Sequence, residues 1–317
     1  MKGMPVHIAR DSRGKFIVLV PGQLPQLYGT DGRFLQEIGR AGEGPGEFVA
    51  AAHVTTLPGD SLLVLDAQLR RASVLRPDLS FARAVSIPLR AGSLAVLRWP
   101  QLVMANGISF TPEHAGWPLH LLDLSGPTAQ HKGSFGDNRG ELRAGQPGLL
   151  TRRFMHASRE GFWAAHALRY QAARYSLSGK TVDVLLRRPS WFSKESAWTI
   201  GSPRIPPPPI VDAVMIRGDT LWVAIRTARP DWSRAWEGVT IPPSGELTSA
   251  QVPDRTRLYR SRLEVIDLKH ARLLTQKAVD GIVVYLGKDL TAIVYDLVDD
   301  LLPRLRVFDL RLRKETR

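Results

Sequence analysis

The chain has 317 residues, of which 44% are hydrophobic, with 27 glycines, 23 prolines, no cysteine and a formal net charge of +13. This length allows one large hydrophobic core, and the lack of cysteine excludes disulfides, thiolate nucleophiles and thiolate metal ligands. No stretch is apolar for the roughly 18 residues that a membrane span needs, so the sequence predicts no span.

The positive charge is spread along the chain. Only nine of the 43 basic residues are lysines, and the modest clusters lie at residues 152–153, 187–188 and 304–317. Such a distribution favours solvated surface charge. A face that binds nucleic acid or another polyanion is the alternative.

Strands recur along the chain in quartets. The first strand of each quartet starts near residues 6, 52, 92, 155, 211 and 280, and the second starts near residues 15, 61, 101, 161, 220 and 290. The third and fourth strands form hairpins at residues 26–38, 73–85, 120–132, 173–185, 264–276 and 306–317. Each hairpin has an alternating strand, a polar or glycine turn and a second alternating strand. Almost no helical periodicity occurs.

Six antiparallel four-stranded units at this spacing predict an all-β fold, a six-bladed β-propeller. The expected blades are residues 5–48, 49–90, 91–150, 151–190, 210–279 and 280–317, in one domain spanning residues 1–317. Hairpin turns at Asp31, Asp78 and Ser125 are 47 residues apart, whereas 91 residues separate Ser178 from Lys269. Blade five therefore carries extra material. A seventh blade hidden there is the alternative, although no further quartet is evident.

A glycine-rich corner joins the first two blades. It consists of Gly39, Arg40, Gly42, Gly44, Pro45, Gly46, Glu47 and Phe48. These glycines permit unusual backbone angles, and the corner leads into a strand rather than a helix, which argues against a phosphate cradle. We expect Glu47 to accept hydrogen bonds from this loop and Phe48 to fill the gap between blades one and two.

The corner resembles the linker of bacterial six-bladed β-propellers related to the NHL repeats, where a G-R-x-G-x-G-P-G-E-F run joins one blade to the next. The resemblance implies a periplasmic or cell-envelope protein with an export or lipoprotein signal. Residues 1–5 lack the apolar segment of such a signal, so we expect the natural start to lie upstream. The resemblance indicates an architecture and no particular activity.

The sequence of the last blade does not determine how the propeller closes. If the hairpin at residues 306–317 supplies the third and fourth strands, blade six has all four strands of its own. Closure then depends on side chains packed between the first and last blades. A strand from a missing amino terminus is the other possibility.

Two insertions surround blade five, at residues 188–209 and 227–257. Both belong to loop classes that lie on one face of a propeller, so we expect them to cover the mouth of its channel. They contain four of the eight tryptophans, Trp191, Trp198, Trp232 and Trp236. These side chains either pack the loops onto the blades or form a cap that faces a ligand or partner.

Equivalent positions of the six first strands carry an unusual set of residues. These are His7, His53, Ser93, His156, Asp212 and Gly281. If they face the channel, His7, His53, His156 and Asp212 converge at its mouth as a ligand-binding group. Imidazoles and a carboxylate also suit Zn²⁺ or acid–base catalysis. Alternatively, the histidines are hydrogen-bonded residues between blades. The sequence predicts no metal or other cofactor.

Other candidate sites are weaker. The segment at residues 135–149 is a degenerate copy of the corner, and its Asp137, Asn138 and Glu141 fit a solvated loop better than a cation site. No G-x-S-x-G motif is present and no serine–histidine pair is apparent. The sequence also lacks the Glu, Asn and Asp set with which propeller lactonases bind calcium.

These patterns favour a non-catalytic binding or interaction module that uses the channel mouth and the aromatic insertions of blade five. Its partner is a small molecule or a protein. One alternative is a lactonase-like hydrolase or a lyase with a His/Asp site at the channel mouth. The other is an NHL-like propeller that binds RNA or another polyanion.

Overall fold

The computed structural model describes residues 3–87, 93–105, 114, 116–136, 152–158, 160–192, 204–240, 253–299 and 302–312. The chain divides into two compact units. One comprises Met1–Ala167 and Ala172–Val184, and the other comprises Leu168–Gln171 and Leu185–Arg317. Blades one to four belong mainly to the first unit, and blades five and six belong to the second.

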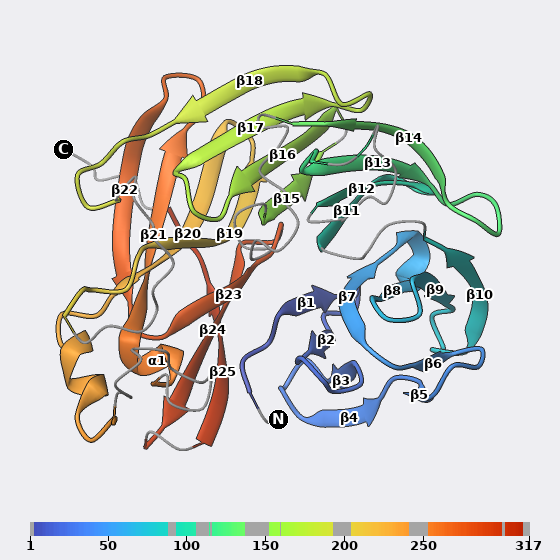
Figure 1. Cartoon of the computed structure of the whole chain (residues 1–317), viewed down its shortest axis with the longest axis horizontal. Coiled ribbons are helices and arrows are strands. Elements are labelled where there is room, and N and C mark those ends of the chain that lie inside the picture. Colours follow the sequence, from blue (N-terminus) through green and yellow to red (C-terminus); the bar gives the residue numbers. More distant parts are fainter. Residues whose placement is uncertain are drawn as a thin grey trace. The chain divides into compact units, whose positions relative to one another are not determined.

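The prediction of a six-bladed β-propeller is confirmed. In the first unit, four sheets of four antiparallel strands follow one another, and in each sheet neighbouring strands are consecutive in the chain (Figure 1). Blade one holds β1 (His7–Arg10), β2 (Phe16–Leu19), β3 (Gln26–Tyr28) and β4 (Phe34–Glu37). Blade two holds β7 (Ala51–Thr56), β8 (Leu62–Asp66), β9 (Arg71–Leu75) and β10 (Phe81–Ser86). Blade three holds β11 (Ser93–Arg98), β12 (Gln101–Ala105), β13 (Leu119–Asp123) and β14 (Gln130–Phe135). Blade four holds β15 (Arg153–Ala157), β16 (Gly161–His166), β17 (Gln171–Ser176) and β18 (Thr181–Leu186).

The second unit contains longer strands. Blade five holds β19 (Ile210–Arg217), β20 (Thr220–Ala228), β21 (Tyr259–Asp267) and β22 (Arg272–Val279). Blade six holds β23 (Ile282–Leu286), β24 (Thr291–Val298) and β25 (Leu302–Asp309). Among the described residues this last sheet has three strands. The expected hairpin at residues 306–317 is wrong in its start, because β25 begins at Leu302, and residues 313–317 lie outside the described part.

The core lies between neighbouring sheets. Central strands such as β8 and β16 are buried along their whole length, which explains their nearly continuous apolar sequence. Outer strands face solvent on at least one side, and all four residues of β4 are exposed. Residues of blades one and two share one cluster, in which Leu19 and Val64 are fully buried. Burial on both faces therefore distinguishes the inner strands from the outer ones.

The glycine corner is rigid and well hydrogen-bonded. Its short strands β5 (Arg40–Ala41) and β6 (Glu47–Phe48) pair in parallel. Glu47 Oε2 accepts a hydrogen bond from Gly44 N at 2.9 Å, and Phe48 is buried in the cluster shared by blades one and two, as the sequence predicts. Gly39 has φ +78°, and a Cβ there would lie 2.5 Å from the Phe48 ring. Glycine is therefore required at this position by both backbone angle and space.

A buried carboxylate in blade two binds backbone amides from two separate segments. Asp66 ends β8 and is fully buried. Its Oδ2 accepts from Val49 N and Ala50 N at 2.8 and 3.0 Å, and its Oδ1 accepts from Gln68 N and Leu69 N at 3.0 and 2.8 Å. One side chain thus holds the incoming strand and the following turn together.

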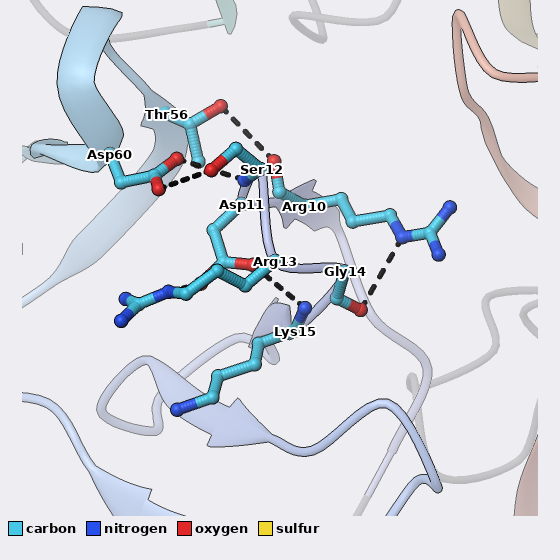
Figure 2. A network of polar contacts seen from close by, with 8 residues as sticks. All are labelled: Arg10, Asp11, Ser12, Arg13, Gly14, Lys15, Thr56 and Asp60. Atoms are coloured by element: carbon cyan, nitrogen blue, oxygen red, sulfur yellow. Dashed lines mark hydrogen bonds and ion pairs between the residues drawn. The ribbon is translucent and has the colours of Figure 1, made fainter.

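Blades one and two are also joined at the β1–β2 turn (Figure 2). Ser12 donates from its backbone N to Asp60 Oδ1 at 2.8 Å and from Oγ to Asp60 Oδ2 at 2.5 Å. Thr56 Oγ1 donates to the Arg10 carbonyl at 3.3 Å. These contacts fix the first two inner strands, and with them His7 and His53, relative to each other.

The extra material of blade five lies between its second and third strands, as predicted. After β20 the chain forms the 3-10 turn η2 (Trp232–Trp236), and it re-enters β21 through the short helix α1 (Arg255–Leu258). Asp254 caps this helix by accepting from Thr256 N at 2.8 Å. The helix packs against η2, β21 and β24 (Figure 1). The insertion therefore returns to the inner strands of its own unit.

Candidate functional site

His7 and His53 are brought together from neighbouring blades of the first unit. Nδ1 of His53 lies 3.2 Å from Nε2 of His7, and the ring centroids are 3.9 Å apart. His53 is buried and His7 is half-buried. Because one nitrogen donates to the other, the remaining nitrogens of the pair offer one donor and one acceptor.

Both imidazoles are neutral. Burial lowers the pKa of His53 to about 3. Burial also lowers the pKa of His7 well below its usual value, with smaller contributions from His53 and the Arg152 guanidinium. A buried pair of this kind resists protonation and is held by its mutual hydrogen bond.

The other first-strand positions behave differently. His156 is buried in β15 and pairs with Trp163, the third residue of β16. His7 and His53 instead pair with Leu19 and Leu65, near the ends of their second strands. His156 therefore occupies another level of its strand. Ser93 Oγ donates to the Arg153 carbonyl at 2.9 Å, and Gly281 accepts from Ser261 N through its carbonyl.

Asp212 belongs to the second unit and forms a buried ion pair. Arg226 donates to it from Nε at 2.6 Å and from Nη2 at 2.7 Å, and the two side chains are 9% and 4% exposed. Asp212 is the extra residue of a β-bulge between Val211 and Ala213. A bulge redirects the side chain that it carries, and here it aligns the carboxylate with Arg226 on β20.

Arg255 lies near this pair at the start of α1. Its side chain is exposed and has no hydrogen bond or ion pair among the described residues. Its pKa is lowered, first by desolvation and second by the charge of Arg226. Arg255 is thus a surface arginine that is partly desolvated by the residues around it.

Tyr259 completes the group that we call the blade-five site, namely Asp212, Arg226, Arg255 and Tyr259. Its side chain is fully buried, and its hydroxyl has no hydrogen-bond partner in the described part of the chain. The Arg226 guanidinium lies over its ring, 5.4 Å from the centroid. Burial raises the pKa of Tyr259 to about 12, and the charges of Arg226 and Arg255 act in the opposite direction. The hydroxyl is thus a neutral donor close to both guanidiniums.

Of the predicted cap tryptophans, one is buried and two are half-buried in the described part of the chain. Trp236 is buried in η2, and Trp232 is half-buried. Trp191 is half-buried, with its ring 6.1 Å from that of Tyr170 and with the Arg262 guanidinium 4.5 Å above it. Trp198 lies outside the described residues, as do Asp137, Asn138 and Glu141.

A second polar group of this unit surrounds Glu264 on β21. Its fully buried carboxylate accepts from the Tyr170 hydroxyl and from Arg262 Nε at 2.7 Å, and it forms an ion pair with Arg187 Nη1 at 3.2 Å. The pKa of Tyr170 is raised by burial and by its hydrogen bond to Glu264. The group therefore stabilises the segment around Trp191.

Sequence reasoning missed Arg226, Arg255, Tyr259 and Glu264. Arg226 follows the apolar run 221–225, and Glu264 lies between Leu263 and Val265, which is the one signal that the sequence offers for a buried charge. It also missed a serine–histidine contact in blade three, where Ser134 Oγ lies 2.8 Å from His120 Nδ1 and 2.9 Å from His131 Nε2. The sequence does not make this contact apparent, because it depends on the β13–β14 register, which brings His120 opposite Ser134.

Two further findings concern metals and membranes. Among the described residues, no three histidine, aspartate or glutamate side chains are grouped to hold a metal ion. In the same part of the chain, no helix has the length and hydrophobicity required to cross a bilayer.

Comparisons with known proteins support the fold. No family model and no curated protein matches the chain. A solved structure of a DUF4221 family member from Bacteroides vulgatus is similar over 97% of this chain and 94% of its own, with a TM-score of 0.63 and 9% identity. A protein from Bacteroides fragilis whose name describes it as exported matches 92% of this chain and 79% of its own, with a TM-score of 0.57 and 10% identity. Hydrazine synthase from Kuenenia stuttgartiensis matches 92% of this chain and 73% of its own, with a TM-score of 0.52 and 11% identity. At such identities the likeness concerns the fold, which is that of bacterial propellers.

Proposed function

We propose that the chain is a non-catalytic binding module whose ligand site is the blade-five site. One observation carries this proposal. Arg255 and the Tyr259 hydroxyl have no partners among the described residues, although they lie close to a buried ion pair on the inner strands. Unpaired polar groups beside a buried ion pair are typical of positions where a ligand supplies the missing contact.

The geometry favours binding over catalysis. Both Asp212 oxygens accept hydrogen bonds from Arg226, so this carboxylate is poorly placed to act as a base. His7 and His53 lie within hydrogen-bond distance of each other, and burial lowers the pKa of both, so neither imidazole is suited to proton transfer near neutral pH. The lactonase-like hydrolase remains the competing function, and the ligand role of His7, His53 and His156 stays a prediction.

The family and location also belong to this proposal. The corner motif supports a relation to NHL-type propellers, and the exported relative from Bacteroides fragilis supports a place in the periplasm or cell envelope. The single domain spanning residues 1–317, the channel mouth and the cap role of the tryptophans stay predictions of the sequence.

A thermal-shift screen tests the proposed site. The chain is melted with a set of cationic, neutral and anionic small molecules, in parallel with Arg255→Ala and with the control Arg257→Ala, which changes an exposed arginine of the same helix. We expect at least one compound to raise the melting temperature of the parent and of Arg257→Ala, with the shift lost in Arg255→Ala. Equal shifts in all three proteins, or none, would contradict the proposal.

The competing functions have their own assays. Hydrolysis of model lactones or esters that is lost in His53→Ala would support the enzyme. Binding of a random oligonucleotide that weakens steeply with salt would support the polyanion-binding propeller.

A further inference from the structure

We infer that the blade-five site takes a small molecule through a carboxylate or phosphate group, an oxyanion held by Arg255, Arg226 and the Tyr259 hydroxyl. This inference rests on the proposed function and names the chemistry of its ligand.

The unused groups are all hydrogen-bond donors. Asp212 engages Nε and Nη2 of Arg226, so Nη1 is left without an acceptor among the described residues. The Arg255 guanidinium and the Tyr259 hydroxyl likewise have no acceptor there. Two guanidiniums and a neutral hydroxyl match an oxyanion, because a guanidinium binds carboxylate or phosphate oxygens with parallel N–H donors.

The charges around Arg255 also favour a bound anion. Asp212 neutralises Arg226 through a bidentate pair, whereas Arg255 has no such partner in the described part of the chain. The Asp254 carboxylate caps α1 through Thr256 N and Oγ1, and it is the weakest of the charges that act on Arg255. An arginine that is desolvated and repelled by a second arginine gains from a bound anion.

The same arrangement disfavours a cation. Both oxygens of Asp212 are already bound at 2.6 and 2.7 Å by Arg226, so no carboxylate oxygen of this pair is free. A neutral ligand could accept from the Tyr259 hydroxyl but would form no ion pair with the Arg255 guanidinium, which has none among the described residues. The site therefore selects a negatively charged group over its neutral analogue.

The placement suits a small ligand. Tyr259 is fully buried and Arg226 is 3% exposed, so the hydroxyl and one guanidinium lie at the inner end of the site. Arg255 is exposed at the outer end, on the helix that the insertion contributes. The donors therefore run from the buried strands to the surface, where a compact anionic group would meet Arg255 first.

Isothermal titration with defined probes tests the inference. Inorganic phosphate, a monocarboxylate (acetate) and a tricarboxylate (citrate) are titrated at constant ionic strength, with ethanol as the neutral analogue of acetate and with chloride as the background ion. The proteins are the parent, Arg255→Gln, Tyr259→Phe and the control Arg257→Gln. Far-ultraviolet circular dichroism and the melting temperature of each variant without ligand verify that it is folded.

We expect at least one oxyanion to bind the parent and Arg257→Gln equally. Arg255→Gln should weaken this binding at least tenfold, and Tyr259→Phe about threefold to tenfold, because each loses a hydrogen bond to a charged group. The Tyr259 readout applies if Arg255→Gln fails to fold. Tighter binding of phosphate or of the carboxylates then shows which oxyanion the site prefers.

Two results would overturn the inference and are distinguishable. Failure of every oxyanion, combined with a neutral or cationic compound that stabilises the chain through Arg255, would refute the oxyanion and retain the proposed site. Failure of every compound to bind through Arg255 or Tyr259 would refute both. Oxyanion binding that is unaffected by both substitutions would place the anion elsewhere and overturn the inference as well.

Discussion

Arg226 and Asp212 meet through two parallel hydrogen bonds, Nε to Oδ2 at 2.6 Å and Nη2 to Oδ1 at 2.7 Å. The pair joins the first two strands of blade five, β19 and β20. Both side chains are nearly buried, so each depends on the other for its charge to be compensated.

Removal of one partner should therefore be costly. We expect Asp212→Ala to lower the free energy of unfolding by about 3–5 kcal/mol, because it leaves the Arg226 charge buried without a counterion. The double variant Asp212→Ala/Arg226→Met should recover part of this loss. Urea denaturation measures both. A single variant that matches the parent, or a double variant no more stable than the single, would contradict the role of the pair.

Asp66 offers a second test of a buried carboxylate. Its two oxygens accept four backbone hydrogen bonds, and no side chain of another type can replace them. We expect Asp66→Ala to destabilise the chain by at least about 3 kcal/mol, since hydrogen bonds to charged groups contribute about 1.5–3 kcal/mol each. The control Asp31→Ala, at an exposed turn, should change stability by less than about 0.5 kcal/mol.

The histidine pair predicts a pH dependence of stability. The pKa of His53 is about 3 in the folded chain, against about 6.5 when unfolded. Between these values the unfolded state binds more protons, so stability should fall as the pH drops below 6.5. This histidine alone should cost about 2 kcal/mol between pH 7 and pH 5.

Urea denaturation of the parent and of His53→Asn at the two pH values checks this expectation. The variant should lose less stability on acidification than the parent. A parent that loses no more than the variant would show that the pair is protonated in the folded state.

The corner provides a matched pair of glycines. Gly39 and Gly22 have similar φ angles of +78° and +74°, but a Cβ at Gly39 meets the Phe48 ring and a Cβ at Gly22 meets nothing within 4 Å. We expect Gly39→Ala to cost about 1–3 kcal/mol more than Gly22→Ala, because only the first adds a steric clash to the backbone strain. Equal melting temperatures for the two variants would contradict this view of the corner.

The fold could largely be predicted from the sequence because its determinants are local. Apolar and polar residues alternate along each strand, and the strands and their turn residues repeat at a regular spacing. The glycines of the corner indicate backbone angles that other residues avoid. Phe48 and Glu47 could be assigned roles for the same reason.

The candidate site could be predicted only in part, because its contacts depend on the register of paired strands. Asp212 stands at the predicted position, but its partner is 14 residues away across a strand pair with a bulge, and the pattern of the sequence does not reveal a bulge. His156 stands at another level of its strand because β15 begins at Arg153, a buried charged residue that the apolar pattern leaves out. That the Tyr259 hydroxyl has no hydrogen-bond partner among the described residues follows from three-dimensional packing alone.

The most direct test of the account is a crystal structure of the chain with the compound that stabilises it most. If the blade-five site binds an oxyanion, a negatively charged group of this compound lies within hydrogen-bond distance of the Arg255 guanidinium and the Tyr259 hydroxyl. A compound bound elsewhere, with these two groups unchanged and still without a partner, would contradict it.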